Sequence, residues 1–329
     1  TPASYDPNIT WETTTTYNAG IDFGFHGDRI TGSVDAYLRN TEDLLNNVQT
    51  PMGSNFGNTV YTNIGSMQNK GLEFALNFIP VQTKDWHLSI GVNGTFQDTK
   101  ITKLNATDDP NYYENTSGIS HGTGSYIGRH QVGYAPYSYW VMQQLYDENG
   151  KPIQNAFVDR NEDGVVNADD KYCAGDPNAD FYYGLNMKLQ YKNWDFGFNA
   201  HGSLGFKVFN DFASNNSTAY FDVNAGNLPN FATAVKRTGF TQISGDYQFF
   251  SDFYLEDASF FRMDDINLGY TFKDLGKWGG NIRVAASCQN VFVLTKYSGI
   301  DPEINSTDGV DRTFWPRPRT FSVRLNINF

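Results

Sequence analysis

The residues best suited to chemistry lie in one short stretch, DRNEDGVVNADD, which spans residues 159–170. Acidic and amide side chains occupy its positions 1, 3, 5, 9 and 12, and glycine stands at position 6, where the backbone must turn sharply. Oxygen ligands at this spacing wrap one hard cation, and Ca²⁺ is the cation that such loops take. The predicted metal ligands are the side chains of Asp159, Asn161, Asp163, Asn167 and Asp170 and the main-chain carbonyl of Val165.

Two features make this calcium loop unusual. Asp170 stands at position 12, where such loops commonly carry glutamate, so we expect weaker and monodentate ligation there. No helical pattern precedes the loop, so it is not a complete EF-hand. The alternative interpretation is an acidic, solvated turn. We expect a structural cation that holds a long loop in place.

The rest of the chain offers little catalytic chemistry, and we expect no enzyme activity. The five histidines show no zinc spacing, and neither a G-x-S-x-G elbow nor a P-loop occurs. The formal charge of −12 argues against nucleic acid as a partner, because phosphate binding relies on clustered lysine and arginine. Two cysteines, Cys173 and Cys288, give no disulfide framework.

Aromatic and amide side chains gather in two polar stretches, residues 134–146 and 215–227. Stacking rings next to asparagine and glutamine suit sugar or peptide ligands. Packing of the loops on one another explains the same composition equally well.

The elements that must position these residues are β-strands. Aromatics make up 16% of the chain and glycine is abundant, a composition typical of β structure. Apolar and polar residues alternate in nine segments, and such alternation predicts strands with one apolar and one polar face. The segments are 17–25, 30–39, 72–78, 86–96, 183–191, 194–201, 266–272, 282–289 and 320–329.

The connections between these segments alternate in length. Every odd-numbered segment is joined to the next by a short turn, whereas every even-numbered one is followed by a polar connection of roughly 30 to 80 residues, although loops beyond about 15 residues are uncommon in compact domains. Short turns at one end and long loops at the other are typical of an outer-membrane barrel. The longest loop, residues 97–181, contains the calcium-type stretch, and we expect it to be extracellular.

Lipid explains the two-faced strands. One face meets lipid, the other a polar lumen, and all backbone groups must pair because lipid offers no hydrogen bonds. No apolar run approaches the length of a membrane helix. Aromatic residues mark the segment ends, as in barrel girdles: Tyr17, Phe25, Trp86, Phe96, Tyr191, Trp194, Tyr270, Phe272 and Phe329. The fold class expected is therefore all-β, an antiparallel transmembrane β-barrel.

The odd number of segments adds a further expectation. Nine antiparallel strands leave the first and the last parallel, whereas single-chain bacterial barrels almost always have even numbers. An open edge in lipid leaves unpaired amides. We therefore expect residues 1–329 to be the C-terminal part of one larger barrel, whose other strands come from an upstream segment or a companion chain.

Six motifs resemble the C-terminal barrel half of SusC/RagA-type TonB-dependent transporters of Bacteroidetes. They are NITWETTTTYNAGIDFGF (8–25), NKGLEFALNF (69–78), DRNEDGVVNADD with AGDPNADFYYGLN (159–186), FFRMDDINLGYTF (260–272), QNVFVLTKYSGIDPEI (289–304) and WPRPRTFSVRLNINF (315–329). The resemblance implies a 22-stranded barrel of which these are the last nine strands, and a chain terminus on Phe that the assembly machinery reads.

The resemblance also implies partners. It implies an N-terminal plug and a TonB-contact segment outside this sequence, energy delivered through TonB with ExbB and ExbD, and a SusD-like surface lipoprotein as lid. The implied substrates are oligosaccharides or oligopeptides, imported across the outer membrane of a Gram-negative bacterium. Two alternatives remain open at this point: a calcium-stabilised, secreted or surface-attached β-rich binding protein such as an adhesin, and a passive porin.

Overall fold

The computed structural model describes the chain except residues 1–3, 51–55, 106–108, 110, 220–229, 242–244, 246, 274–279, 305 and 329. Its main element is a nine-stranded sheet in the order β1-β2-β3-β4-β11-β12-β15-β16-β18. The strands are β1 Thr13–Phe25, β2 Ile30–Gln49, β3 Thr59–Gln82, β4 Trp86–Lys103, β11 Phe181–Tyr191, β12 Trp194–Leu204, β15 Phe260–Phe272, β16 Asn281–Thr295 and β18 Thr320–Asn328. All nine predicted strands are confirmed.

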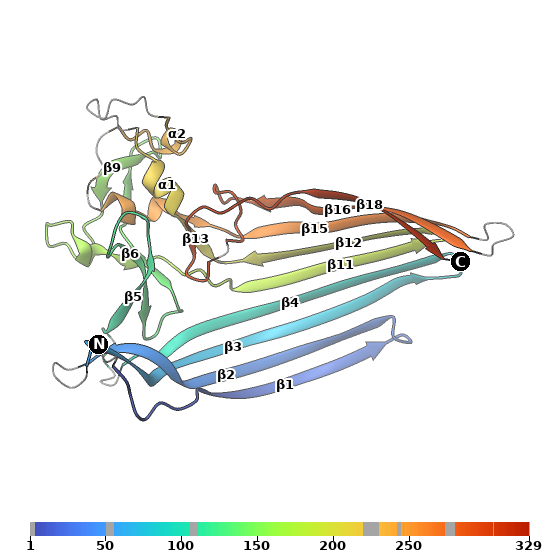
Figure 1. Ribbon diagram of the computed structural model, residues 1–329, viewed down its shortest axis with the longest axis horizontal. Helices are drawn as coiled ribbons and strands as arrows, with labels where there is room; N and C mark the ends of the chain where they lie inside the picture. Colours follow the sequence, from blue (N-terminus) through green and yellow to red (C-terminus); the bar gives the residue numbers. More distant parts are fainter. Residues whose placement is uncertain are drawn as a thin grey trace.

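The strands run side by side along the long axis of the molecule (Figure 1). Every neighbouring pair in the sheet is antiparallel. Consequently β1 and β18 point the same way, toward the end of the sheet that carries the short turns. Among the described residues β1 pairs with β2 alone and β18 with β16 alone, so the sheet is open. No helix in the described part of the chain is long and apolar enough to cross a membrane.

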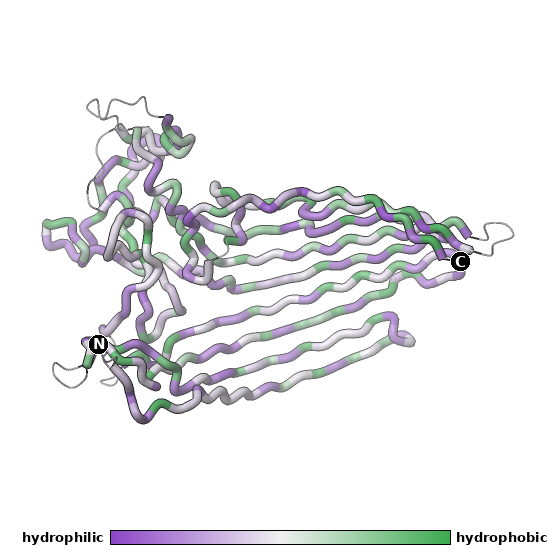
Figure 2. Tube along the Cα trace, viewed as in Figure 1, coloured by the Kyte–Doolittle hydropathy of each residue, from purple (hydrophilic) through white to green (hydrophobic). Residues whose placement is uncertain are grey.

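The two faces of the sheet differ in polarity. Hydropathy alternates along the strands (Figure 2), as the period-2 pattern predicted. The apolar face is solvent-exposed: Ile21 is 72% exposed, Leu268 45% and Val323 81%. A large exposed apolar surface marks an interaction face. This face argues against the adhesin alternative, which predicted burial on both sides of the sheet.

Two bands of aromatic rings cross the apolar face. Near the turns, the rings of Trp86 and Tyr191 are in tilted contact with centroids 4.1 Å apart, and Trp194 contacts the neighbouring Tyr270 at 4.8 Å. Near the loops, Phe181 stacks on Phe96 at 4.2 Å. The bands lie at opposite ends of β11, which at about 3.3 Å per residue separates them by roughly 33 Å along the strand. A tilt of about 40° reduces that to roughly 25 Å, the height of a barrel's apolar band.

Three of the four predicted long connections are present, and the last of them is somewhat shorter than expected. Residues 104–180, 205–259 and 296–319 join β4 to β11, β12 to β15 and β16 to β18. The long loop predicted between β2 and β3 is wrong, because the two strands continue as one hairpin and leave only residues 50–58 between them. Bulges near Thr41 and Leu44 shift the register there, which breaks the alternation by which strands were recognised. The loop expected over 97–181 likewise begins later, since β4 continues to Lys103.

The three long connections fold together into what we call the loop module, at the end of the sheet opposite the short turns (Figure 1). Its elements are β5 Tyr113–Gly118, β6 Tyr126–Gln131, β7 Ser138–Val141, β8 Gln144–Tyr146, β9 Pro152–Phe157, η1 Ala168–Asp170, β10 Tyr172–Cys173, β13 Lys207–Asn210, α1 Asp211–Asn216, α2 Val235–Thr238, η3 Gln248–Phe250, η4 Asp252–Tyr254, β14 Leu255–Asp257 and β17 Val310–Asp311. Strands β14, β13 and β17 form one small sheet from two different connections.

The largest buried core lies in the loop module and not in the nine-stranded sheet. Tyr139, Phe209 and Val310 come from the three connections, and each is at most 1% exposed in one apolar cluster. Tyr139 belongs to the aromatic stretch 134–146, so packing among loops accounts for that ring. Most of the other aromatic stretch, 215–227, lies outside the described residues.

Candidate functional site

The calcium-type loop lies between β9 and β10 in the loop module and ends in η1. At position 1, Oδ2 of Asp159 accepts a hydrogen bond from the Gly164 amide at 2.8 Å, whereas its Oδ1 is buried and has no hydrogen-bond partner. Gly164 has φ +84°, a left-handed conformation that glycine adopts at little cost. The loop therefore closes on itself and leaves one carboxylate oxygen unsatisfied inside.

Positions 3 and 5 shape the same curve. Oδ1 of Asn161 accepts from the Asp163 amide at 3.1 Å, and Oδ1 of Asp163 accepts from the Val165 amide at 2.8 Å. The Val165 carbonyl at position 7 accepts from the Asn167 side chain at 3.3 Å. The predicted ligands thus lie on one tight turn, which is what a single cation requires.

Asp170, at position 12, closes the loop through hydrogen bonds. Its Oδ1 accepts from the amides of Arg160 at 2.7 Å and Asn161 at 3.3 Å, and its Oδ2 accepts from Asn167 at 2.8 Å. The side chain is fully buried. The Asn167 amide, followed by those of Arg160 and Asn161, holds the pKa of the Asp170 carboxyl below its ordinary value against the effect of burial.

The structure brings the six predicted calcium ligands together in one loop, but it does not form a cluster of converging carboxylates. In the part of the chain that the structure describes, no group of three or more His, Cys, Asp or Glu side chains is arranged to hold a metal ion. A cation here would depend on Asp159 Oδ1 together with amide and carbonyl oxygens. The donor set fits Ca²⁺, which accepts such neutral oxygens readily.

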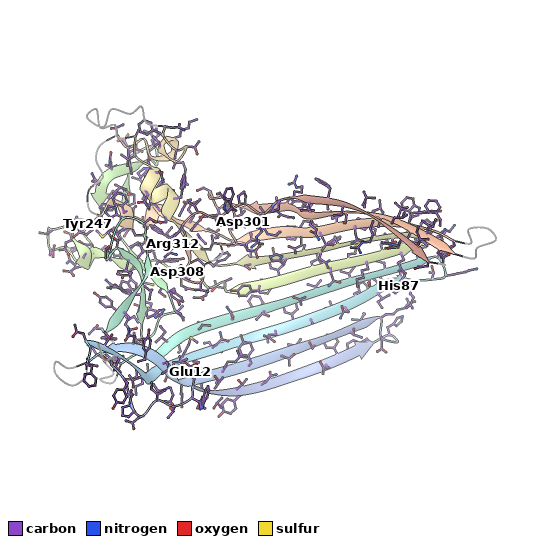
Figure 3. The ribbon with its side chains drawn as sticks, viewed as in Figure 1. Glu12, His87, Tyr247, Asp301, Asp308 and Arg312 are labelled. Carbon is purple, nitrogen blue, oxygen red and sulfur yellow. The ribbon has the colours of Figure 1, made fainter. Side chains whose placement is uncertain are left out.

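A second polar site was not predicted from the sequence. Six charged or ionisable side chains meet at the loop end of the polar face, and we call them the luminal ion cluster: His201, Arg262, Asp264, Asp301, Glu303 and Arg317. Arg262 and Asp301 are only 2% and 4% exposed and form an ion pair. Figure 3 places Asp301 at the loop end of the sheet and His87 at the opposite end.

Glu303 connects the members of the cluster. Its Oε2 lies 2.9 Å from Nε of Arg262 and 2.7 Å from Nη1 of Arg317, and its Oε1 lies 3.3 Å from Nε2 of His201. The other His201 nitrogen lies 2.7 Å from Asp264. In the pairing of β15 with β12, Asp264 is the extra residue of a bulge, and bulges commonly redirect a side chain in this way. The cluster fastens the connection 296–319 to the wall formed by β12 and β15.

A cavity of about 490 Å³, which we call the wall cavity, adjoins this cluster. His201 and Ser203 line it from β12, at alternate positions that share the polar face with Asp195 and Asn199. The rings of Tyr137, Tyr182, Phe206 and Phe260 line it as well. Apolar walls with few polar groups are typical of ligand pockets.

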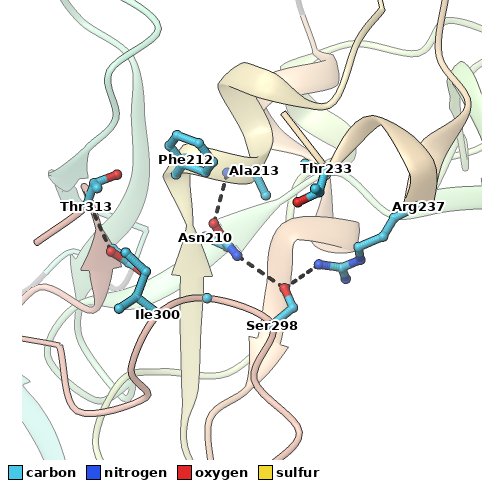
Figure 4. A pocket seen from close by; sticks show the side chains of 11 residues that line it. Asn210, Phe212, Ala213, Thr233, Arg237, Ser298, Ile300 and Thr313 are labelled. Carbon is cyan, nitrogen blue, oxygen red and sulfur yellow. Dashed lines mark hydrogen bonds between the residues drawn. The ribbon is translucent and has the colours of Figure 1, made fainter. Parts of the chain in front are cut away.

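A smaller cavity of about 300 Å³ lies inside the loop module (Figure 4). The polar side chains around it already bond one another: Asn210 donates to Ser298 at 3.3 Å, and Arg237 donates to the same hydroxyl. Arg237 also pairs with Glu256 at 3.0 Å. These groups serve the packing of the module, so the wall cavity is the better candidate for a ligand.

Part of the luminal ion cluster could have been recognised from the sequence. Arg262 and Asp264 stand in FFRMDDINLGYTF just before the predicted strand 266–272, and charged residues in a membrane strand need partners inside the barrel. The partner Asp301, however, follows 39 positions later in a loop, and no local pattern connects the two.

Comparison with known proteins gives consistent results. Residues 1–291 match the protein family described as TonB dependent receptor-like, beta-barrel. The whole chain aligns with TonB-dependent receptor SusC of Bacteroides thetaiotaomicron at 44% identity and covers 33% of that protein. It is 29% identical to TonB-dependent receptor P3 of Formosa agariphila over 98% of this chain and 34% of that one. The chain thus spans about a third of the length of the curated relatives it matches.

A solved structure of the RagAB peptide transporter shares the fold. The match has a TM-score of 0.76 at 22% identity and covers 98% of this chain and 36% of that one. At this identity the likeness concerns the arrangement of the strands and loops alone.

Proposed function

The chain belongs to the TonB-dependent receptor β-barrel family, and from this premise we propose that it forms part of an importer of oligosaccharides or oligopeptides. Such receptors are outer-membrane proteins of nutrient uptake and not enzymes. We place this chain in the outer membrane of a Gram-negative bacterium, with its apolar face in lipid and the loop module outside the cell.

One observation carries the proposal: the sheet is apolar and exposed on one face, polar on the other, and has the wall cavity at the loop end of the polar face. A ligand entering between the loops would meet the rings of Tyr137 and Tyr182 and the polar groups of His201 and Ser203. Rings give contact area to sugars and peptides alike, and polar groups orient the ligand.

The proposed mechanism needs partners beyond this chain. A SusD-like lipoprotein would cover the loop module, a plug contributed by the rest of the protein would close the barrel, and TonB with ExbB and ExbD would supply the energy. The residues described here would bind and orient the ligand and fasten the loops to the wall. Binding under the lid, movement of the plug and release into the periplasm would follow in this order.

An uptake experiment with the full-length protein tests the proposal. The gene is deleted in the source bacterium, and the strain is complemented with the wild-type gene or a variant. Uptake of labelled oligosaccharides or oligopeptides is then measured. Ser203→Phe fills the wall cavity and should abolish uptake, whereas Ser287→Phe makes the same change on the polar face of β16, away from the cavity, and should not. Equal uptake by both variants would remove the wall cavity from the proposal.

Two further outcomes separate the alternatives. Collapse of the proton gradient should stop uptake through a TonB-driven importer and leave a passive porin unaffected. A detergent extract of outer membranes should contain the chain together with a plug-bearing segment and a large lipoprotein. Recovery of the protein in the aqueous fraction would instead favour the adhesin.

We further propose that residues 159–170 bind Ca²⁺ in a structural role. The unpartnered, buried Oδ1 of Asp159 supports this, since a cation would satisfy it. Terbium luminescence and melting temperature of the full-length protein, with and without chelator, test the proposal. Asp159→Asn should abolish the chelator effect. Asp147→Asn is the matched control, because Asp147 also holds a turn by accepting two backbone amides and lies outside the loop. A chelator effect that is absent in the wild type would refute the proposal.

A further inference from the structure

In the part of the chain that the structure describes, two partly buried cations of the loop module have no acidic partner. The guanidinium of Arg129 on β6 lies between two rings, 3.9 Å from the centroid of Tyr113 and 4.6 Å from that of Trp140. The ammonium of Lys171 lies 3.9 Å from the centroid of Phe250. Within the described residues no carboxylate is among the groups that shift the pKa of either cation. This is unexpected in a chain with 36 acidic and 24 basic residues.

The two cations belong to one site. The small sheet has the order β10-β7-β6-β5, and Cys173 of β10 pairs with Trp140 of β7, against which Arg129 packs. Lys171 precedes Cys173 by two residues and is therefore on the same face of the chain. The charge of Arg129 also acts directly on Lys171. Two like charges are thus held together at a cost to the folded state.

Contacts with the rings do not account for this arrangement. A ring face attracts a cation, but it leaves the edge of the guanidinium and its N–H donors without acceptors. The indole N–H of Trp140 in the same cluster is also buried without a partner. Tyr113 remains 41% exposed, so the cluster can be reached from solvent.

We propose that Arg129 and Lys171 form a binding site for a carboxylate group of the transported ligand. A guanidinium is planar and presents its N–H donors in one plane, which matches the two oxygens of a carboxylate, and the lysine adds a second charge. The ligand class that fits is an acidic oligosaccharide or a peptide with a free C-terminal carboxylate. This inference rests on the proposed function, since it assumes that ligands enter through the loop module.

Matched ligands test the proposal. Calorimetry with the full-length protein in detergent compares a short oligogalacturonide and a tripeptide, each in its acid form and as its methyl ester. The ester keeps the size and removes the charge. At least one acid should bind about tenfold or more tightly than its ester, a difference of about 1.4 kcal/mol. Whichever acid shows the difference identifies the source of the carboxylate.

Three variants separate the site from general effects. Arg129→Gln and Lys171→Gln should each remove the preference for the acid, whereas Lys84→Gln, which removes one charge in the turn at the opposite end of the sheet, should keep it. The melting temperature of each variant shows whether it is folded. If one of the two site variants does not fold, the other still tests the proposal. Equal binding of acid and ester by the wild type, or tighter binding of inorganic phosphate than of both acids, would overturn the proposal. Because calorimetry needs neither TonB nor a membrane, failed uptake with preserved acid preference would count against the proposed function alone.

Discussion

Replacement of Arg262 by methionine should release the connection 296–319 from the barrel wall. Arg262 is 2% exposed and pairs with Asp301, which is 4% exposed. Removal of one partner of a buried ion pair costs about 3–5 kcal/mol, because the other charge stays buried without compensation. Arg317 remains 3.8 Å from Asp301, so we expect the lower end of this range, about 3 kcal/mol. At 1.36 kcal/mol per tenfold, opening of the segment becomes more frequent by a factor on the order of 100.

Hydrogen exchange measured by mass spectrometry on the full-length protein tests this expectation. Amides of residues 299–319 should exchange about two orders of magnitude faster in Arg262→Met, while amides of β3 stay unchanged. Lys70→Met is the control, because the Lys70–Asp98 pair is 54% and 61% exposed at 3.1 Å and such pairs contribute about 0–1 kcal/mol.

A second variant makes the reasoning refutable. Arg262→Met combined with Asp301→Leu removes both buried charges and should recover much of the lost protection, because no unpaired buried charge remains at that position. If Arg262→Met accelerates exchange no more than Lys70→Met does, the cluster does not fasten the segment. If the double variant exchanges faster than the single one, unpaired charge is not the cause.

Three shorter predictions concern other parts of the molecule. Gly164→Ala, at φ +84°, should weaken Ca²⁺ binding about tenfold, because alanine pays a backbone cost of about 1–2 kcal/mol in this conformation. Gly150→Ala, at φ +75°, is the control: it should lower the melting temperature without changing the response to chelator. Since the folded-state pKa of Lys171 is lowered from 10.5 to about 8, the folded chain binds fewer protons between these values; the melting temperature of the wild type relative to Lys171→Met should therefore rise with pH across that window, and a flat difference would contradict the shift. Val323→Arg on the apolar face should reduce the amount of full-length protein in the outer membrane, because a charge there costs about 2–4 kcal/mol at mid-membrane, while Ser322→Arg on the polar face should be tolerated.

The strands of this protein could be predicted because their signal is local. Side chains alternate between two faces with a period of two residues, so runs such as Ile282 to Cys288 reveal both the strand and its apolar face. The same alternation fixes the register, since a slip by one residue would turn the apolar face toward the lumen. Where strands extend beyond the alternation, as β2 and β3 do past the bulge at Leu44, the sequence no longer distinguished strand from loop.

The tight turn of residues 159–170 could be predicted for a similar reason. The six predicted ligands lie within twelve residues, and Gly164 supplies the backbone conformation that the turn needs. The spacing did not reveal that both oxygens of Asp170 accept backbone hydrogen bonds. That use of Asp170 depends on how the chain closes on Arg160 and Asn167 after folding.

Only the tertiary structure decided how the loops use their charges. Arg262 and Asp301 come from a strand and a loop. Arg129 lies in β6, and Lys171 lies between η1 and β10, 42 positions later in the sequence. Each residue alone is compatible with a solvated surface. Their burial depends on three connections that pack into one module, and such long-range contacts leave no periodic trace in the chain. The sequence by itself therefore determined the wall of the barrel and which face meets lipid, whereas folding determined which charges are paired inside it and which remain available to a ligand.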